Sequence, residues 1–298
     1  MTRDARAAAA ALLDREPAIP EPAREFAFSD ADFRSLAQFA YEQAGISLSD
    51  SKRNLVYSRL SRRLRALGLR TFVEYREFLA ENASELEAFI NAISTNLTKF
   101  FREAHHFDHL RSHVAVPFVQ EAHGKVGRRL RVWSAGCSTG EEPYSIAVVL
   151  KREIRDIERH DVKILATDID TEVIRKGARG EYPLNSIDEV PRPYREFFEP
   201  AAGERKEETV VVDRAIRDLV TFRRLNLMET WPFNGNFDAI FCRNVMIYFD
   251  GPTKAALIER FTNKLKPGGW LYIGHSESLN GLHPGLQLVG RTIYRREA

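Results

Sequence analysis

The stretch RVWSAGCSTGEEPYSIA, which runs from Arg131 to Ala147, decides how the second half of this chain is interpreted. A short apolar run ends in small residues and two glycines, and an amphipathic helix pattern begins at two glutamates. A strand, a glycine-rich turn and a helix in this order are typical of nucleotide sites in parallel sheets. We therefore predict that this stretch belongs to a doubly wound α/β domain.

Strand and helix patterns alternate after Arg128, which implies a parallel, doubly wound sheet. The expected strands are 129–135, 162–170, 219–227, 237–249, 270–278 and 286–296, and the expected helices are 141–154, 171–178 and 251–269. The last strand directly follows its predecessor, which suggests an antiparallel hairpin at one edge of the sheet. Residues 180–218 contain four prolines and a β-rich run. This segment is too long for a plain crossover, so we expect a small inserted antiparallel β subdomain there.

The first half of the chain shows helical patterns. Helices are expected over 29–45, 49–68, 71–82 and 84–98, followed by 105–122 leading into the second half. Ser29 or Asp30 suits the first N-cap, and Gly45 and Gly68 suit the ends of the first two helices. We therefore expect a disordered tail over 1–25, an all-α domain over 26–100 and the α/β domain over 101–298.

Composition excludes several classes of protein. The chain has 298 residues, of which 44% are hydrophobic and 29% charged, and no apolar run approaches the roughly 18 residues of a membrane span. The N-terminal ARAAAAALLDRE is short, has no evident cleavage motif and is followed by acids, so we do not expect export. The two cysteines, Cys137 and Cys242, suggest neither a disulfide framework nor a metal cluster. We expect a cytoplasmic monomer that binds no metal and does not insert into a membrane.

The glutamates of the glycine turn argue against a phosphate ligand. The spacing Gly136-x-x-x-Gly140 differs from the dinucleotide fingerprint, and Glu141 and Glu142 stand where a pyrophosphate would rest. Two carboxylates suit a ligand with a cationic portion, and S-adenosylmethionine has an α-amino group and a sulfonium. Either glutamate could instead only complement the helix dipole, and sequence chemistry does not separate the two.

Two further strand ends carry polar side chains. Asp168 follows an apolar strand run, where an acid can accept hydrogen bonds from ribose hydroxyls, while Asp170 suits the cap of the next helix. Arg243, Asn244 and Tyr248 lie in FCRNVMIYF (241–249), just past a buried strand run, and the carboxyl ends of central strands form the ligand site in this architecture. The acid alone fits NAD or S-adenosylmethionine; the acid and the turn together favour the latter.

One window of the helical half is strongly basic. No acid lies between Asp50 and Glu74, whereas seven arginines and lysines do. With 100° per residue, Val56, Leu60, Leu64 and Leu67 cluster on one face of helix 49–68 and the cations spread over the other. This face could be merely solvated, but the lack of acids favours an anionic partner, and nucleic acid or lipid would fit the charge alone. The candidate docking residues are Arg53, Arg59, Arg62 and Arg63.

Taken together, the motifs resemble the chemotaxis-receptor glutamate methyltransferases of the CheR family. The resemblance extends in order from about Phe26 to the C-terminus. It is carried by TNLTKFFREAHHF (95–107), WSAGCSTGEEPYSIA (133–147), ATDID (166–170), RRLNLM (223–228), FCRNVMIYFD (241–250) and LKPGGWLYIGHSES (265–278). It implies a Rossmann-like class I S-adenosylmethionine-dependent methyltransferase domain, a helical N-terminal domain that docks on the receptor, and the β subdomain.

The resemblance also implies roles for individual residues. Asn96, Thr98 and Arg102 would form the contribution of the helix-to-linker segment to the cofactor site. Glu142 and Asp168 would hold the methionine and ribose portions. The pocket would be completed by the glycine turn at Gly136, by Asn226 and Leu227 near the adenine, and by Arg243 and Asn244. Arg102 and Tyr248 would face the methyl group as the catalytic residues.

The implied reaction moves a methyl group from S-adenosylmethionine to a glutamate carboxylate, leaving S-adenosylhomocysteine. A glutamate side chain in water has a pKa of about 4.3, so the acceptor is ionised at neutral pH and needs no general base. The partner would be the cytoplasmic domain of chemoreceptors, with methylation setting adaptation, and no nucleic acid. The β subdomain of some family members binds a receptor C-terminal peptide, and the sequence leaves open whether this one does. One alternative is a methyltransferase acting on nucleic acid, but the Pro-Pro-aromatic turn that such an enzyme would show at FCRNVMIYF (241–249) is absent. The other alternative is a cofactor-binding scaffold without turnover.

Overall fold

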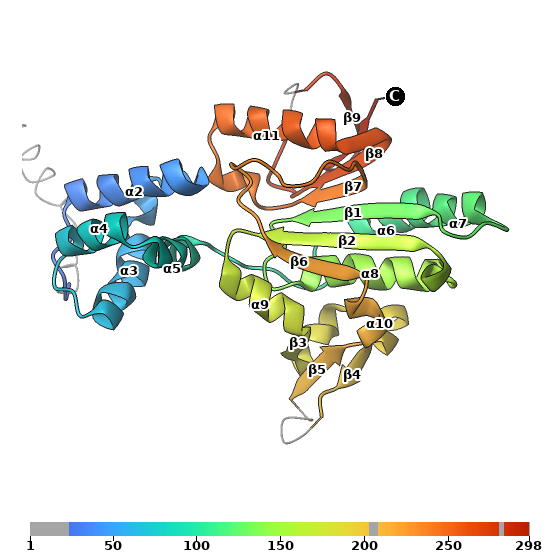
Figure 1. Ribbon diagram of the computed structural model, residues 1–298, viewed down its shortest axis with the longest axis horizontal. Coiled ribbons are helices and arrows are strands. Elements are labelled where there is room, and N and C mark those ends of the chain that lie inside the picture. Colours follow the sequence, from blue (N-terminus) through green and yellow to red (C-terminus); the bar gives the residue numbers. More distant parts are fainter. Residues whose placement is uncertain (1–23, 203–207, 280–282, 298) are drawn as a thin grey trace, which may run out of the picture.

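The structure is a computed structural model that describes residues 24–202, 208–279 and 283–297. A small helical domain stands beside a large mixed sheet, and a small three-stranded sheet projects below the large one in this view (Figure 1). Most of the expected tail, residues 1–23, lies outside the described residues. Within the described ranges, no helix is long and apolar enough to cross a bilayer.

The helical domain is built from α2 (Asp30–Ala44), α3 (Arg53–Leu67), α4 (Phe72–Glu81) and α5 (Ala83–Ile93). The predicted caps are confirmed: Ser29 forms a capping box with Asp32, and Gly45 and Gly68 end α2 and α3 in left-handed conformations. The helices share a core of their own, which extends from Phe26 to Ile93. Of the four apolar residues of α3 predicted from the helical period, Val56, Leu60 and Leu64 are fully buried in this core, and Leu67 packs against it partly buried.

The large sheet confirms the predicted doubly wound fold. Its strand order is β6-β2-β1-β7-β8-β10-β9. The strands are β1 (Arg129–Ala135), β2 (Asp161–Asp168), β6 (Val220–Arg224), β7 (Phe237–Cys242), β8 (Leu265–Ile273), β9 (Leu286–Gly290) and β10 (Ile293–Arg296). The first five pair in parallel, and β10 inserts antiparallel between β8 and β9. The order reverses beside β1, which is where ligands bind in such sheets.

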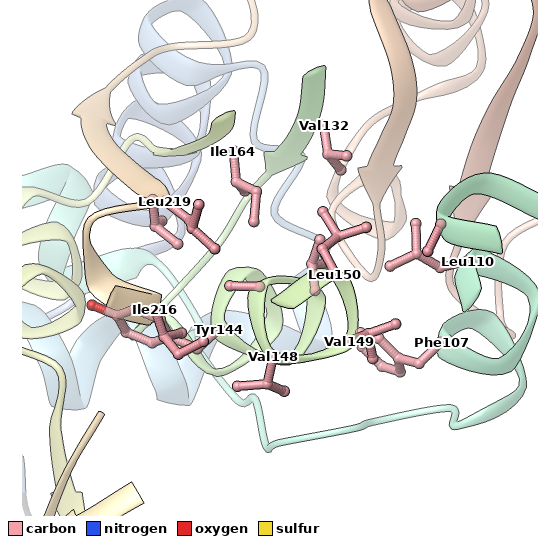
Figure 2. Close-up of a cluster of buried hydrophobic side chains, with 14 of the residues drawn as sticks. Phe107, Leu110, Val132, Tyr144, Val148, Val149, Leu150, Ile164, Ile216 and Leu219 are labelled. Carbon is pink, nitrogen blue, oxygen red and sulfur yellow. The ribbon is translucent and has the colours of Figure 1, made fainter. Parts of the chain in front are cut away.

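Helices cover both faces of this sheet. One face packs on α8 (Glu141–Glu153) and on a continuous segment of α6 (His105–Leu110), a π-helical turn (Arg111–Ala115) and α7 (Val116–Ala122). Figure 2 shows Val148, Val149 and Leu150 of α8 beneath Val132 and Ile164 of the strands. Side chains of alternate strand residues, such as Trp133 and Ile240, point to the other face and pack on α11 (Gly251–Lys264). Trp133 is fully buried there among other aromatic rings.

The predicted β subdomain is present as a separate antiparallel sheet of order β3-β5-β4. Its strands are β3 (Glu181–Pro183), β4 (Phe198–Pro200) and β5 (Thr209–Val212), preceded by α9 (Thr171–Arg179) and followed by α10 (Arg214–Arg217). The buried Tyr182 joins this sheet to the glycine turn, because its hydroxyl donates to the Thr139 carbonyl at 2.7 Å. The insertion is therefore attached to the loop that forms the ligand site.

Several predicted boundaries are wrong, and the errors lie where the chain leaves regular structure. The helix expected over 84–98 ends at Ile93, because Ser94 is extended. The helix expected over 251–269 ends at Lys264, since Leu265 already pairs with β7 and Pro267 cannot continue a helix. The strand expected over 237–249 ends at Cys242. The final strand expected over 286–296 is two strands, separated by a turn in which Thr292 has a φ of 56°.

Candidate active site

A cavity of about 230 Å³ lies between the carboxyl ends of the parallel strands and the helical domain. The strand ends contribute the residues after β1, β2, β6 and β7, and the other wall comes from residues 44–55 and 93–102. All eleven residues predicted for the cofactor and for catalysis line it: Asn96, Thr98, Arg102, Gly136, Glu142, Asp168, Asn226, Leu227, Arg243, Asn244 and Tyr248. The cavity is therefore the candidate site.

The glycine turn at the end of β1 closes tightly on the loop after β7. Gly136 has a φ of 82°, and a Cβ built on it would lie 2.2 Å from Cγ2 of Val245. Ser138, two residues further along, has a left-handed φ of 48°, and its hydroxyl donates to the Asn96 carbonyl at 2.9 Å. Only glycine fits at 136, so the turn can approach a ligand with its backbone.

The structure separates the two glutamates at the start of α8. Glu142 lines the cavity and is 8% exposed, whereas Glu141 does not line it and accepts a hydrogen bond from the Thr139 hydroxyl at 2.6 Å. Glu142 accepts from the Ser134 hydroxyl at 2.7 Å and from Arg243 at 3.0 Å. Burial raises the pKa of Glu142, and the Arg243 guanidinium opposes that rise. Glu142 is thus the buried carboxylate available to a cationic ligand.

Arg243 also connects the cavity to a second buried acid. Its guanidinium lies 3.4 Å from Glu103 and donates to the Arg102 carbonyl. Burial would raise the pKa of Glu103, but Arg243 and a hydrogen bond from His275 hold it below its usual value. One guanidinium therefore lies between two carboxylates, Glu103 and Glu142, and together the three groups carry a net charge of −1 that suits a cationic ligand.

Asp168 ends β2 and is 8% exposed. One of its oxygens accepts from the Ser138 N–H at 2.8 Å and the other from the Asp170 N–H at 3.0 Å. Burial raises the pKa of Asp168 to about 6, although these N–H groups favour the ionised form. Each oxygen retains a second lone pair for a ribose hydroxyl. Asp170, as predicted, is the N-cap of α9, and its other oxygen accepts from Asn96 at 2.7 Å.

The segment after α5 forms the other wall of the cavity. Residues 94–98 are not helical, and Asn96, Leu97 and Thr98 line the cavity. Arg102 donates to the Leu97 carbonyl at 2.8 Å. The two residues beside Arg102, Phe101 and Glu103, both have left-handed backbones, with φ of 52° and 58°. Backbone strain of this kind costs about 1–3 kcal/mol per residue and is concentrated at functional sites.

Tyr248 and Asn244 come from the loop after β7. The Tyr248 hydroxyl donates to the Thr95 carbonyl at 3.4 Å, and Asn244 has a left-handed φ of 59°. Sequence reasoning missed the residue that holds this loop. Glu277, 7% exposed, accepts from the N–H groups of Gly274 at 2.6 Å, Asn244 at 3.0 Å and Ile247 at 3.2 Å. Glu277 lies within the quoted motif LKPGGWLYIGHSES (265–278), but nothing in that motif indicates its role, because it contacts Gly274, Asn244 and Ile247 only through their backbones.

The helical domain contributes more to the cavity than the sequence suggested. Asn226 donates to the Gln43 carbonyl at 2.8 Å, and the Ser47 N–H donates to the Tyr248 carbonyl at 2.8 Å. Cavity residues that were not predicted include Ala44, Ile46, Ser47, Leu48, Lys52 and Leu55 of this domain. These residues share only their position, at the end of α2, in the connection to α3 and in the first turn of α3, and this position becomes informative only once the domains are placed together.

Three of the four predicted docking arginines have partners within the chain. Arg53 pairs with Asp30, and Arg63 pairs with the buried Glu85 at 2.6 Å. Arg59 donates to the carbonyls of residues 92, 93 and 94, at 2.6–3.3 Å, and so caps the C-terminal end of α5. Arg62 is exposed on α3. The basic face is therefore partly structural, and Arg62 is its best candidate for contact with a partner.

One group of side chains has the spacing of metal ligands. Single ligand atoms of Glu103, His105 and His106 lie within 4.8 Å of one another. Arg243 lies 3.4 Å from the Glu103 carboxylate, so a cation there would face a buried positive charge. Burial lowers the pKa of His106 to about 3, with Arg243 acting in the same direction. We interpret this group as part of the support of Arg243.

The residues of the cavity fit S-adenosylmethionine. A backbone-lined glycine turn, a buried acid at the tip of β2 and a second buried acid at the start of α8 face one cavity at the switch point of the sheet. Only the second acid stands where a phosphate would rest in a dinucleotide site. This fold and site define a class I S-adenosylmethionine-dependent methyltransferase.

Comparisons with known proteins show the family of this methyltransferase. Residues 31–94 match the family described as CheR methyltransferase, all-alpha domain, and residues 96–295 match CheR methyltransferase, SAM binding domain. The chain belongs to the CheR methyltransferase family. The expected fold class and the expected methyltransferase activity are thereby confirmed, with S-adenosylmethionine as the methyl donor.

Curated relatives match over most of their length. Chemotaxis protein methyltransferase 2 of Pseudomonas aeruginosa is 45% identical over 91% of this chain and 95% of the relative. Chemotaxis protein methyltransferases of Salmonella typhimurium and Escherichia coli are 45% and 44% identical, over 91% and 90% of this chain and 92% and 91% of theirs. A methyltransferase of nucleic acid is not favoured by these matches.

Proposed function

We propose that this enzyme methylates glutamate side chains in the cytoplasmic domains of chemoreceptors, forming methyl esters that set receptor adaptation. The observation that carries the proposal is the lining of the cavity around Arg102 and Tyr248. Two cationic side chains, Arg102 and Lys52, reach the cavity from the side opposite the strand ends, and the described lining contains no histidine. This arrangement suits an acceptor that arrives as an anion and needs no base to ionise it.

The strand ends would supply most of the site of the methyl donor, and Asn96 and Thr98 would contribute to it from the opposite wall. Glu142 would hold the α-amino group, Asp168 the ribose hydroxyls, and Gly136 would let the backbone approach the ligand. Asn226 and Leu227 would border the adenine, and Asn96, Thr98, Arg243 and Asn244 would complete the pocket. The donor supplies an electrophilic methyl group on a sulfonium and would leave as S-adenosylhomocysteine.

The other half would position the acceptor. Arg102, fixed by its bond to the Leu97 carbonyl, would orient the carboxylate, and the Tyr248 hydroxyl would donate a hydrogen bond to it. Their contribution is alignment and removal of water from the nucleophile. Binding the anion too tightly would lower its reactivity, so we expect orientation more than strong ground-state binding.

The helical domain would select the partner. Arg62 is exposed on the basic helix α3, and Lys52 lies where this helix meets the cavity. A receptor helix that carries several glutamates is an anionic partner of the right kind. Arg53, Arg59 and Arg63 would support this face through their bonds within the domain.

The test is transfer of labelled methyl groups from S-adenosylmethionine to two acceptors, a receptor cytoplasmic fragment and nucleic acid. We expect label on the receptor that mild base releases as methanol, because esters hydrolyse readily. Base-stable label on nucleic acid, or no label on the receptor, would refute the proposal. Arg102→Ala serves as the control for label that does not depend on the site.

A further inference from the structure

Two exposed apolar side chains lie next to the residues that would face the methyl group. Leu97 is 80% exposed and Ile247 is 46% exposed. Leu97 supplies the carbonyl that accepts from Arg102, and Ile247 directly precedes Tyr248. Single exposed apolar residues are common on protein surfaces, so exposure alone does not make these two a contact site.

The backbone around both residues is held in place. Asn96, beside Leu97, is bonded through its side chain to Asp170 and through its carbonyl to Ser138. The N–H of Ile247 donates to the buried carboxylate of Glu277. Both side chains are therefore exposed on segments whose backbone is held by hydrogen bonds, so a loose backbone does not explain their exposure. The protein presents two apolar groups in fixed positions, one from each segment that carries a catalytic residue.

The two segments meet at the cavity. The Tyr248 hydroxyl contacts the Thr95 carbonyl at 3.4 Å, which places the loop of Ile247 against the segment of Leu97. Leu97 also lines the cavity itself. Lys52, exposed on the same wall, adds a positive charge nearby. Leu97 therefore offers apolar surface at the cavity, Ile247 offers it beside Tyr248 on the neighbouring loop, and Lys52 adds a cation on the same wall.

We infer that Leu97 and Ile247 form an acceptor-recognition contact, which packs against apolar side chains within one helical turn of the acceptor glutamate. The partner that fits is an acidic amphipathic segment: the glutamate enters the cavity, its apolar neighbours cover Leu97 and Ile247, and further acids face Lys52. This inference rests on the proposed function. It adds that the enzyme recognises the apolar residues next to the acceptor glutamate. Small apolar contacts of this kind discriminate modestly, typically by ~10–200-fold in kcat/KM.

The experiment compares variants with a matched control at saturating S-adenosylmethionine. The test variants are Leu97→Ser, Ile247→Ser and the double variant. The control is Leu288→Ser, because Leu288 is 59% exposed on the edge strand β9, outside the site. Ile247→Ser is the cleaner single change, since Ile247 is not among the described residues that line the cavity. Cofactor affinity by calorimetry and the thermal midpoint are measured for each protein.

The double variant should raise KM for a receptor cytoplasmic fragment by about tenfold relative to Leu288→Ser, consistent with loss of a contact at the centre of an interface. A second acceptor carries serine in place of the apolar residues within one turn of the acceptor glutamate. With that acceptor, wild type and double variant should have the same KM. Equal KM values with this second acceptor would identify the contact. A general effect on folding or on cofactor binding would raise the KM of the double variant for both acceptors.

Two results would overturn the inference while leaving the proposed function intact. In one, wild type methylates the fragment and the double variant has the KM of Leu288→Ser. In the other, the penalty of the double variant is equal for both acceptors. If wild type places no label on the receptor fragment, the proposed function falls and this inference falls with it.

Discussion

The two walls of the cavity are built in different ways. The strand-end wall is fixed by a parallel sheet, and its acids Glu142 and Asp168 are buried and hydrogen-bonded on both oxygens. The opposite wall belongs to the helical domain and the segment after α5, and it is joined to the sheet domain by hydrogen bonds between side chains and loops, such as those from Asn226 to Gln43 and from Asn96 to Asp170. The first wall suits a constant ligand, the methyl donor. The second wall, apart from Asn96 and Thr98 at the donor pocket, suits a variable ligand, the protein acceptor.

If this division holds, substitutions on the two walls must change different constants. The largest effect is expected at Arg102. Arg102→Ala removes the group that orients the acceptor carboxylate, so kcat should fall about 100-fold or more, as when one preorganised charge-stabilising donor is lost. Arg102→Lys keeps the positive charge but lacks the planar guanidinium, so its kcat should lie between those of the wild type and of Arg102→Ala. Kinetics at saturating donor give kcat, and calorimetry gives the dissociation constant of the donor, so the two constants are measured separately. A loss of donor affinity as large as the loss in kcat would contradict the division.

The next largest effect is expected at Asp168. Asp168→Ala removes charge-assisted hydrogen bonds to the ribose, each about 1.5–3 kcal/mol, so the donor Kd should rise by roughly 10–100-fold while kcat at saturating donor changes little. Calorimetric titration with S-adenosylhomocysteine measures this directly. Asp170→Asn keeps a capping side chain at α9 and provides the matched control, with a much smaller change in Kd.

The same titration has a pH dependence with a defined sign. Burial raises the pKa of Asp168 to about 6, so the carboxylate is protonated as pH falls below that value and loses an acceptor position for ribose. Donor affinity should therefore be constant above pH 7 and decline below pH 6, by up to ~10-fold per pH unit for a single required ionisation. Asp168→Asn should remove this dependence. An unchanged affinity of wild type down to pH 5 would exclude Asp168 from the donor contact.

Arg59 tests the helical wall through stability. Its guanidinium caps the last carbonyls of α5, so Arg59→Ala should lower the free energy of unfolding by about 1–2 kcal/mol. Chemical denaturation followed by circular dichroism gives the value. The capped carbonyls begin the cavity-lining segment, so donor affinity should also weaken slightly. A fully stable Arg59→Ala protein would show that the three contacts contribute nothing, and would return Arg59 to the candidates for receptor docking.

The smallest effect is expected at Arg62. Arg62→Glu should raise KM for a receptor fragment about threefold to tenfold, leave donor affinity unchanged, and lose its effect near 0.5 M salt, because exposed charges are screened. Arg70→Glu is the matched control, as Arg70 is exposed just beyond the end of α3. Equal KM values for the two variants would remove the basic face from receptor binding.

The strand-end wall of the cavity could be predicted from the sequence better than the opposite wall. Gly136, Asp168 and Arg243 were found because the carboxyl ends of parallel strands meet at one edge, which a pattern of strands and polar tips reveals. For the segment 94–98 the sequence predicts helix, because the helical apolar spacing continues from Ile93 to Leu97. Only the resemblance to CheR proteins drew attention to Asn96, Thr98 and Arg102.

Long-range pairing explains the remaining errors. The cations on α3 suggested a free docking face, yet the partners of Arg59 and Arg63 lie 22 to 35 residues away. Glu277 went unnoticed for the same reason, since it binds N–H groups that any residue type could supply. Helical period indicates which side of a helix is polar; it does not indicate which polar side chains already have partners.

The measurement that tests the central claim most directly is the pH dependence of methyl transfer in a single turnover, with the donor saturating and the receptor fragment as acceptor. The claim is that an already ionised carboxylate is aligned by Arg102 and Tyr248 without a general base. The rate should then be constant from pH 6.5 to 8.5, because a glutamate with a pKa of about 4.3 is fully ionised throughout. A rate that rises about tenfold per pH unit through this range would show that the acceptor or a base must lose a proton, and would contradict the account.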